Sequence, residues 1–284
     1  MSAVSTRARC AQCLRPERTC LCPLVQPVPH AVQLLVLQHP EEELQAKGTG
    51  RLLHLCLPAS RLAVDQLPRQ VQTLKPVGED AQLGASYSGQ SQPPLLMLVV
   101  GETARAQNFG LNGYGRDTTP ALARWQANEG LVNFSQVQSC GTNTKVSVPC
   151  LFSPLTRQQG GDQMPEHENL LDVLQRAGLA VLWIDNQAGC KGVCDRVPQV
   201  RIADAPIPGL CEGGECLDEA MMHGLDARIA ALDPVRRARG VVLVMHQMGS
   251  HGPAYFKRSA PDRKPFMPEC TSNTLSDCPP EQLV

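Results

Sequence analysis

The sequence predicts an α/β fold with a mixed, largely parallel sheet flanked by helices, together with a small cysteine-rich N-terminal segment. Three observations support this prediction. Strand and helix patterns alternate after residue 94, as they do in domains with parallel sheets. The chain has 284 residues, and its hydrophobic content of 42% is sufficient for a globular core. Twelve of its 13 cysteines, all except Cys56, fall into two groups of different spacing, which indicates that the chain has two parts.

The elements of the α/β part are predicted from residue 95 onward. The apolar run at 95–100 predicts a buried strand, and residues 168–176 carry apolar side chains at helical spacing. Gly178 is placed to end that helix, and residues 179–184 form the next predicted strand. A further helix leads to a strand at 241–245. Its apolar stripe recurs at steps of three and four and comprises Leu217, Met221, Leu225, Ile229 and Leu232.

The chain is predicted to have three segments. Residues 1–68 hold the cysteine-rich segment, a strand at 31–37 and a helix at 51–56, which is too little for an independent α/β core. Residues 69–94 are predicted to be a linker, because their second half is rich in Gly, Ser, Gln and Pro. Residues 95–284 form the α/β domain.

Charge and hydropathy exclude some classes of partner. With 26 basic and 27 acidic residues the net charge is −1, so no broad field attracts DNA or an anionic membrane surface. No apolar run is long enough for a signal peptide or a membrane span. From this we expect a cytoplasmic chain.

The two groups of cysteines predict different chemistry. Cys10, Cys13, Cys20 and Cys22 have the dense C-x2-C and C-x-C spacing with which four thiolates surround one zinc ion. The later cysteines bracket short polar loops, as small disulfides do in oxidising compartments. These close pairs are Cys140 and Cys150, Cys190 and Cys194, Cys211 and Cys216, and Cys270 and Cys278.

Ligands of open α/β sheets bind at the carboxyl ends of the strands. The residues at these ends are Glu102, Asp185 and the segment 246–251. Glu102 could be a hard oxygen ligand of a divalent metal ion. The alternative is that it is the acidic first residue of a helix, where the helix dipole favours a carboxylate.

Residues 139–144 form a cluster of small hydroxylated residues around a glycine, between Cys140 and Cys150. Such a loop could hold a nucleophilic hydroxyl at a helix N-terminus beside a metal ion, and the alternative is an ordinary Ser or Thr helix cap. His251 follows a strand, and Lys191 lies inside a small cysteine loop where it could bind a phosphate oxygen. The alternatives are a structural histidine and a solvated lysine.

Five blocks of sequence carry a resemblance to a known family: VVGETARAQNFGLNGYGRDTTP, NFSQVQSCGTNTKVSVPCLFS, NLLDVLQRAGLAVLW, GCKGVCDRVP and MHQMGSHGPAYFKR. In this order and spacing they resemble the bacterial phosphoethanolamine–lipid A transferases of the sulfatase/alkaline-phosphatase superfamily. The resemblance covers residues 70–284.

This resemblance implies zinc as cofactor, with Glu102 and Thr144 as ligands and Thr144 as the catalytic nucleophile. Thr144 would carry phosphoethanolamine on its way from phosphatidylethanolamine to lipid A, a modification that confers polymyxin resistance. Lys191 and His251 would bind substrate, and the four later cysteine pairs would match the family's disulfides. Family members are inner-membrane proteins with a periplasmic catalytic domain.

The chain departs from the family pattern in three respects. Membrane helices do not precede the domain, and the chain ends before the family's Asp-His-Gly metal motif. Lys145 follows the nucleophile where the family usually has alanine, which places a positive charge beside the metal. We therefore expect a C-terminally truncated domain without activity.

The first part of the chain resembles another family. CAQCLRPERTCLCPL, LLVLQHPEE and GTGRLLHLCL are similar to the opening of DTW-domain tRNA-uridine aminocarboxypropyltransferases, over residues 1–66. This resemblance implies S-adenosylmethionine as cofactor and tRNA as partner, and a non-catalytic zinc module is the other alternative. We interpret the chain as a fusion of the two pieces.

Overall fold

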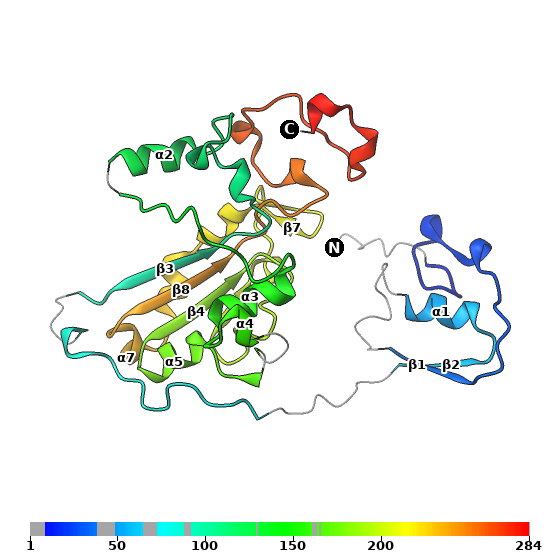
Figure 1. The fold of residues 1–284 in the computed structure, drawn as a ribbon, viewed down its shortest axis with the longest axis horizontal. Coiled ribbons are helices and arrows are strands. Elements are labelled where there is room, and N and C mark those ends of the chain that lie inside the picture. Colours follow the sequence, from blue (N-terminus) through cyan, green and yellow to red (C-terminus); the bar gives the residue numbers. More distant parts are fainter. Residues whose placement is uncertain are drawn as a thin grey trace. The chain divides into compact units, whose positions relative to one another are not determined.

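The computed structural model describes residues 9–38, 49–64, 73–87, 92–128, 130–160, 164 and 166–283 (Figure 1). The chain divides into two compact units, Met1–Gln72 and Thr73–Val284. His39 and Pro40, which belong to the quoted DTW-like blocks, lie outside the described residues. The division into segments 1–68, 69–94 and 95–284 stays a prediction.

Within its described residues, the first unit contains a two-stranded parallel sheet and one α-helix. Strand β1 (Leu34–Gln38) pairs with β2 (Ser60–Val64), and helix α1 (Gly50–Cys56) lies between them in the chain. A helix between two parallel strands is the usual crossover, because the chain must return to the same end of the sheet. Two short 3-10 turns precede the sheet, at Glu17–Thr19 and Cys22–Leu24.

The second unit is built on a four-stranded parallel sheet with the strand order β3-β8-β4-β5. The strands are β3 (Leu95–Val100), β4 (Ala180–Asp185), β5 (Gln199–Arg201) and β8 (Val241–His246). The predicted α/β class with a largely parallel sheet is confirmed.

The helices around this sheet are α2 (Pro120–Ala127), α3 (Thr144–Phe152), α4 (Arg157–Gly160), α5 (Leu170–Arg176), α6 (Leu225–Ala230) and α7 (Pro234–Arg237). A small antiparallel hairpin joins β6 (Cys211–Glu212) to β7 (Glu215–Cys216). Short 3-10 turns lie at Ala85–Tyr87, Ala106–Asn108, Gly110–Asn112, Ile202–Asp204, Asp218–Met222, Tyr255–Lys257, Pro261–Arg263, Leu275–Asp277 and Pro280–Gln282.

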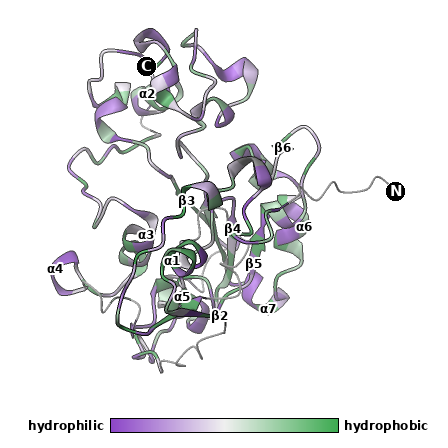
Figure 2. Ribbon diagram, turned by 90° about the vertical axis from the view of Figure 1, so that its right-hand side faces the viewer, coloured by the Kyte–Doolittle hydropathy of each residue, from purple (hydrophilic) through white to green (hydrophobic). Residues whose placement is uncertain are grey.

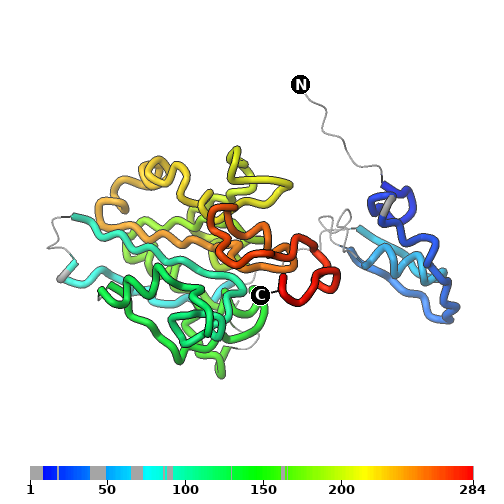
Figure 3. Tube along the Cα trace, turned by 90° about the horizontal axis from the view of Figure 1, so that it is seen from above, coloured from blue at the N-terminus to red at the C-terminus, as the bar shows by residue number. Residues whose placement is uncertain are grey.

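The sheet has a hydrophobic core on each face. Side chains of a strand alternate between the faces, so Val181 and Trp183 of β4 enter one core while Leu182 and Ile184 enter the other. α3 and α5 cover the first face, and the segment from β6 to α6 covers the second. Figure 3 shows these segments on opposite sides of the strands, and in Figure 2 the hydrophobic colouring follows the central strands.

Most predicted elements of this unit are present, and one helix is wrong. The strand predicted at 95–100 is present but is not buried as predicted, because it lies at the edge of the sheet and four of its six residues are exposed. The helix predicted at 168–176 begins at Leu170, where Asn169 caps it in a capping box. The long helix predicted from Leu217 to Leu232 is instead a 3-10 turn followed by α6. Gly224 separates the two because its backbone is left-handed, with φ of 64°, and a left-handed residue ends a right-handed helix.

The described part of the predicted linker packs along the second unit. The carboxylate of Glu168 accepts a hydrogen bond from the Val77 backbone N–H at 3.0 Å, and Arg176 donates to the Val77 carbonyl at 2.6 Å. Leu83 and Tyr87 pack against the core of the first face. Among the described residues, no helix is long and apolar enough to span a bilayer. The location expected from the sequence stays a prediction.

Candidate active site at the carboxyl ends of the strands

Glu102 follows β3 directly and is held by the loop that follows β8. The Ser250 backbone N–H donates to the Glu102 carbonyl at 2.9 Å. A Cβ on Gly249 would lie 2.6 Å from the same carbonyl oxygen, so only glycine permits this approach. The next helical turn begins at Ala106, so Glu102 is not the first residue of a helix.

Thr144 is the first residue of α3 and lies against Glu102. Its Oγ1 donates a hydrogen bond of 2.7 Å to Glu102 Oε2, although the two residues are 42 positions apart in the chain. Asn143, rather than a Ser or Thr, caps the helix by accepting from the Val146 backbone N–H. The Thr144 hydroxyl therefore lies at a helix N-terminus and is available for chemistry.

The surroundings of Glu102 keep its carboxylate ionised. Burial raises the pKa of Glu102, but hydrogen bonds from Thr103 and Thr144 and the nearby His251 and His246 lower it, and the net pKa is below its ordinary value. The other carboxylate oxygen, Oε1, accepts from Thr103 Oγ1 at 2.7 Å. Thr103 adopts a φ of 58°, which is uncommon for a residue other than glycine, and this turn aims its hydroxyl at Glu102.

Four disulfides tie together the loops of the second unit, and they join the pairs named from the sequence. The Cys140–Cys150 bond closes the loop that carries Thr144, because Cys150 lies inside α3. The Cys190–Cys194 bond encloses Lys191. Such short cross-links restrict the site loops even without the support of a large core.

A buried pair of ionisable residues lies behind the site. His246 Nδ1 is 3.2 Å from Asp185 Oδ2, with side chains only 1% and 2% exposed. Burial raises the pKa of Asp185, but hydrogen bonds from His246 and Trp183 lower it more, so the net pKa is below its usual value. Both residues lie at the carboxyl ends of strands and were named from the sequence as candidate site residues. The structure brings them together.

Asp218 organises the loop after β8 and was not foreseen from the sequence. Its two carboxylate oxygens accept from the backbone N–H groups of Met248 at 2.7 Å and Gly249 at 2.9 Å. Oδ1 also accepts from Asn186 Nδ2 at 2.8 Å. Asp218 lies in a segment that was predicted to be the start of a helix, so no local signal marked its side chain as a loop anchor.

His251 and Lys191 are placed differently relative to the Glu102–Thr144 pair. His251 is exposed, contributes to the electrostatic field at Glu102 and lines a cavity of about 320 Å³ together with Asp185 and Arg201. Lys191 donates to the Ala188 carbonyl at 2.5 Å, within its own loop. His251 thus acts on the pair electrostatically, while its Nδ1 lies 2.8 Å from the Gly252 carbonyl. The ammonium of Lys191 is directed at the backbone.

The described residues do not form a complete zinc site around Glu102. The groups of three or more metal-ligating side chains found among them are the N-terminal cysteines and the set Cys190, Cys194 and Asp195, neither of which includes Glu102. Since Cys190 and Cys194 are bonded to each other, they supply no thiolate. Glu102 and Thr144 offer two oxygen ligands, whereas zinc in proteins has at least three protein ligands.

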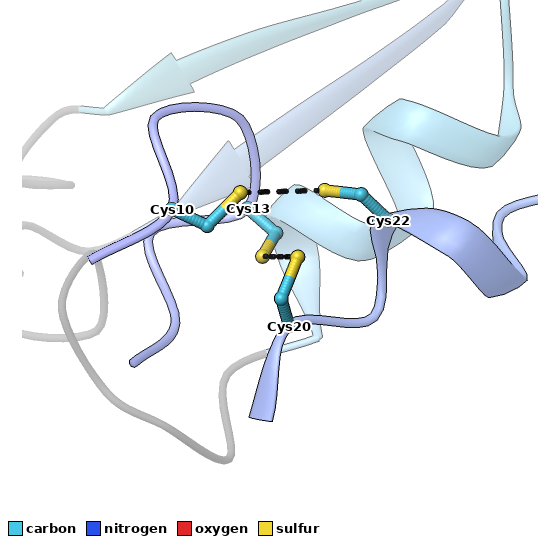
Figure 4. A group of neighbouring side chains, drawn as sticks. All are labelled: Cys10, Cys13, Cys20 and Cys22. Atoms are coloured by element: carbon cyan, nitrogen blue, oxygen red, sulfur yellow. Dashed lines mark hydrogen bonds between the residues drawn. The ribbon is translucent and has the colours of Figure 1, made fainter. Parts of the chain in front are cut away.

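The N-terminal cysteines form a separate cluster (Figure 4). The Arg15 backbone N–H lowers the pKa of Cys13 to about 6, whereas burial and the neighbouring thiols raise the pKa of Cys22 to about 12. When no cation is present, the neighbouring thiols therefore differ in how readily they ionise, because one thiolate disfavours a second negative charge beside it.

Comparison with known proteins connects this geometry to families. The sulfatase family model matches residues 94–282, and the DTW domain model matches residues 7–98. Phosphoethanolamine transferase EptA of Escherichia coli K12 is 44% identical over 209 residues, which are 73% of this chain and 37% of that protein. The chain therefore spans just over a third of the length of this relative.

A solved structure and a second relative agree with the two matches. The soluble domain of lipooligosaccharide phosphoethanolamine transferase A from Neisseria meningitidis superposes with a TM-score of 0.63 and 40% identity, covering 69% of this chain and 57% of that one. Mouse tRNA-uridine aminocarboxypropyltransferase 2 is 42% identical over 60 residues, 20% of each chain. Since the sulfatase model matches well over half of the residues, the chain belongs to the sulfatase family.

Proposed function

We propose that the second unit is the catalytic domain of a phosphoethanolamine transferase in which Thr144 is the nucleophile. The observation that carries this proposal is the hydrogen bond of 2.7 Å from Thr144 Oγ1 to Glu102 Oε2. It joins a hydroxyl at a helix N-terminus to a carboxylate at the end of a strand, where ligands of α/β sheets bind. Both residues lie within the stretch that the sulfatase model matches.

The proposed transfer has two displacements. Thr144 Oγ attacks the phosphorus of phosphatidylethanolamine, the bond between phosphorus and the diacylglycerol oxygen breaks, and that oxygen takes up the proton released by Thr144. A phosphate oxygen of lipid A then attacks the same phosphorus, and Thr144 Oγ leaves and regains a proton. The product is lipid A that carries phosphoethanolamine, a modification connected with polymyxin resistance.

Glu102 orients the nucleophile in this scheme rather than deprotonating it. Its pKa lies below the ordinary value, so at neutral pH the carboxylate is ionised and is a weak base. It accepts the Thr144 hydroxyl hydrogen and thereby fixes the direction of the oxygen lone pairs. The N-terminus of α3 favours the negative charge that develops on Oγ during attack.

We also propose Glu102 and Thr144 as two ligands of the zinc that the family resemblance implies. Two oxygen ligands hold zinc weakly in comparison with the three or four protein ligands of established sites. We therefore expect the chain to be inactive at trace zinc concentrations. Any transfer that it performs requires zinc in excess.

Lys191 and His251 are the proposed substrate-binding residues. His251 acts electrostatically on the carboxylate of Glu102 and lines the cavity that also contains Asp185 and Arg201, so it can donate to a phosphate oxygen there. Lys191 must leave its contact with the Ala188 carbonyl to do the same. We expect His251→Ala to weaken donor binding more than Lys191→Ala does.

Release of diacylglycerol from phosphatidylethanolamine tests the proposal, because this product appears in the first displacement. The full chain, oxidised and supplied with excess zinc, is expected to release it from mixed micelles, and added lipid A is expected to permit repeated turnover. Thr144→Ala should abolish the release, while Thr144→Ser keeps a hydroxyl at the same position and should retain part of it. Equal release by the wild type and Thr144→Ala would contradict the proposal.

A second candidate function concerns the first unit. We propose tRNA-uridine aminocarboxypropyl transfer with S-adenosylmethionine as the alternative, since the DTW model matches residues 7–98. Calorimetric titration with S-adenosylmethionine, with and without tRNA, tests it. Absence of binding heat from folded protein would rule this alternative out.

A further inference from the structure

The cysteine cluster of the first unit is not used by either proposed activity. Cys10 and Cys13 lie in one turn of the chain, Cys20 and Cys22 in the next, and all four side chains point into the space between the turns (Figure 4). The Cys10 and Cys22 sulfurs are 3.6 Å apart, and the Cys13 and Cys20 sulfurs are 3.7 Å apart. All four sulfurs lie within 4.8 Å of one another.

These distances distinguish between a disulfide and a metal site. A disulfide places its sulfurs about 2.05 Å apart, and none of these four cysteines is bonded to another. Four thiolates that lie about 2.3 Å from a central zinc ion are about 3.8 Å from one another. The observed separations of 3.6 and 3.7 Å therefore agree with the edges of a zinc-centred tetrahedron.

The backbone of the first turn holds its two cysteines in this arrangement. The Leu14 backbone N–H donates to the Cys10 carbonyl at 2.9 Å, and the Cys10 N–H donates to the Arg15 carbonyl at 2.9 Å. Leu14 has a φ of 56°, which closes the turn tightly after the second cysteine. Arg51 of α1 donates to the Gln12 carbonyl at 3.0 Å, so the turn is also linked to the helix.

Apolar burial provides little other stabilisation to the first unit. Of the described residues in this unit, only Cys13 has a buried apolar side chain, and Cys13 belongs to the cluster itself. Leu35 and Leu37 of β1 are 61% and 52% exposed, and Leu24 beside the cluster is 74% exposed. Small units with so little core usually depend on a disulfide or a structural metal ion.

We propose that Cys10, Cys13, Cys20 and Cys22 bind a structural zinc ion and that the first unit folds around it. Four protein ligands close the coordination sphere and leave no position for substrate, so this zinc has no catalytic role. The inference does not depend on the proposed transferase activity. Because an unfolded chain has no preformed site, metal binding and folding of this unit are coupled.

Metal content of the purified full chain tests the proposal first. After dialysis against metal-free buffer, elemental analysis is expected to find zinc in the wild type at about one ion per chain. Cys20→Ser/Cys22→Ser should lose it, whereas Cys56→Ser, a free cysteine of the same unit outside the cluster, should keep it. Glu102→Gln should also keep it, which separates this zinc from any bound at the Glu102–Thr144 pair.

Hydrogen exchange tests the coupling to folding. The amides of Val28 and Leu53 donate to the carbonyls of Cys56 and Thr49 within the first unit. A strong chelator is expected to abolish their protection and leave the amides of β8 protected. Zinc-free wild type, equal zinc in the double variant, iron in place of zinc, or unchanged protection after metal removal would each overturn the proposal.

Discussion

The approach of the loop after β8 to Glu102 depends on one residue without a side chain. Gly249 has a φ of 54°, and a Cβ there would lie 2.6 Å and 2.8 Å from the Glu102 carbonyl oxygen and backbone nitrogen. Backbone atoms cannot move aside as the end of a flexible side chain can. The position of Glu102 therefore constrains residue 249 to glycine.

We predict that Gly249→Ala displaces Glu102 and lowers diacylglycerol release at least about tenfold, because misplacement of a site group by even 1 Å is costly. Gly213→Ala is the matched control, since Gly213 also has a left-handed φ, 63°, but has open space where a Cβ would be. Both substitutions lower the free energy of unfolding by about 1–2 kcal/mol, because each places an alanine in a left-handed backbone conformation. Equal activity of the two variants would refute this role of Gly249.

The ion pair of Glu168 with Arg176 predicts a pH dependence of stability. The Arg176 guanidinium, at 2.7 Å, lowers the pKa of Glu168, and the Val77 backbone N–H lowers it further. A carboxyl whose pKa is lower in the folded state stabilises the protein above its unfolded pKa of about 4.3. This contribution is lost as the pH falls from there through the folded pKa.

We expect Glu168→Gln to lower the melting temperature at neutral pH and to have less effect as the pH falls below about 4. Glu166→Gln is the control, because Glu166 pairs with Lys75 at side-chain exposures of 40% and 58% and exposed pairs contribute little. Melting curves of the three proteins across the acidic range provide the measurement. An effect of Glu168→Gln that persists unchanged at low pH would show that the ion pair is not its cause.

At the scale of elements, we expect the central strands to contribute more to the stability of the second unit than the edge strand β3 does. Leu243 of β8 is fully buried between two neighbouring strands, whereas Leu96 of the edge strand β3 is 56% exposed. We predict that Leu243→Ala costs about 2–5 kcal/mol of unfolding free energy. Leu96→Ala should cost no more than about 0.5 kcal/mol.

Chemical denaturation of both variants provides the test, with the Leu96 variant as the matched control for the loss of a leucine side chain. Both residues lie in strands of the same parallel sheet, so strand propensity differs little between them. A similar destabilisation by the two substitutions would mean that β3 is covered in solution.

Elements with strong local patterns could be predicted from the sequence. The strands at 95–100 and 179–184 were found within a residue, because each is a continuous apolar run. Such a run indicates burial on both faces, which holds for β4 but not for the edge strand β3. The helix from Leu217 to Leu232 was wrong because an apolar stripe does not reveal that Gly224 adopts a left-handed backbone.

The same limit applies to the site. Glu102 was named from its position after a strand and the cluster 139–144 from its hydroxyl groups at an expected helix start, and the family resemblance then singled out Thr144. Their contact across 42 residues is a tertiary property that no local pattern contains. Asp218 escaped notice because its role is to accept from backbone N–H groups of a loop that is distant in sequence.

At the scale of the whole molecule, the cysteines of the two units are used differently. The first has four free thiols around a common centre, and the second has four disulfides. Thiolate zinc sites persist in reducing conditions, and disulfides persist in oxidising ones. The stabilities of the two units should therefore respond in opposite ways to chelators and reductants.

We predict that hydrogen exchange followed by mass spectrometry will show two independent unfolding events. A chelator is expected to abolish the protection of backbone amides from hydrogen exchange in the first unit alone. A phosphine reductant is expected to destabilise the second unit, since loss of a disulfide typically costs about 2–5 kcal/mol. A single unfolding transition of the whole chain that responds to both reagents would contradict the prediction that the two units unfold independently.

The central claim is that Thr144 carries phosphoethanolamine. Intact-mass spectrometry of the oxidised full chain, incubated with excess zinc and phosphatidylethanolamine and without lipid A, tests it most directly. We predict a mass increase of one phosphoethanolamine group, located on Thr144 by fragmentation and absent from Thr144→Ala. Folded, zinc-supplied protein that shows no adduct, or an adduct that persists in Thr144→Ala, would contradict it.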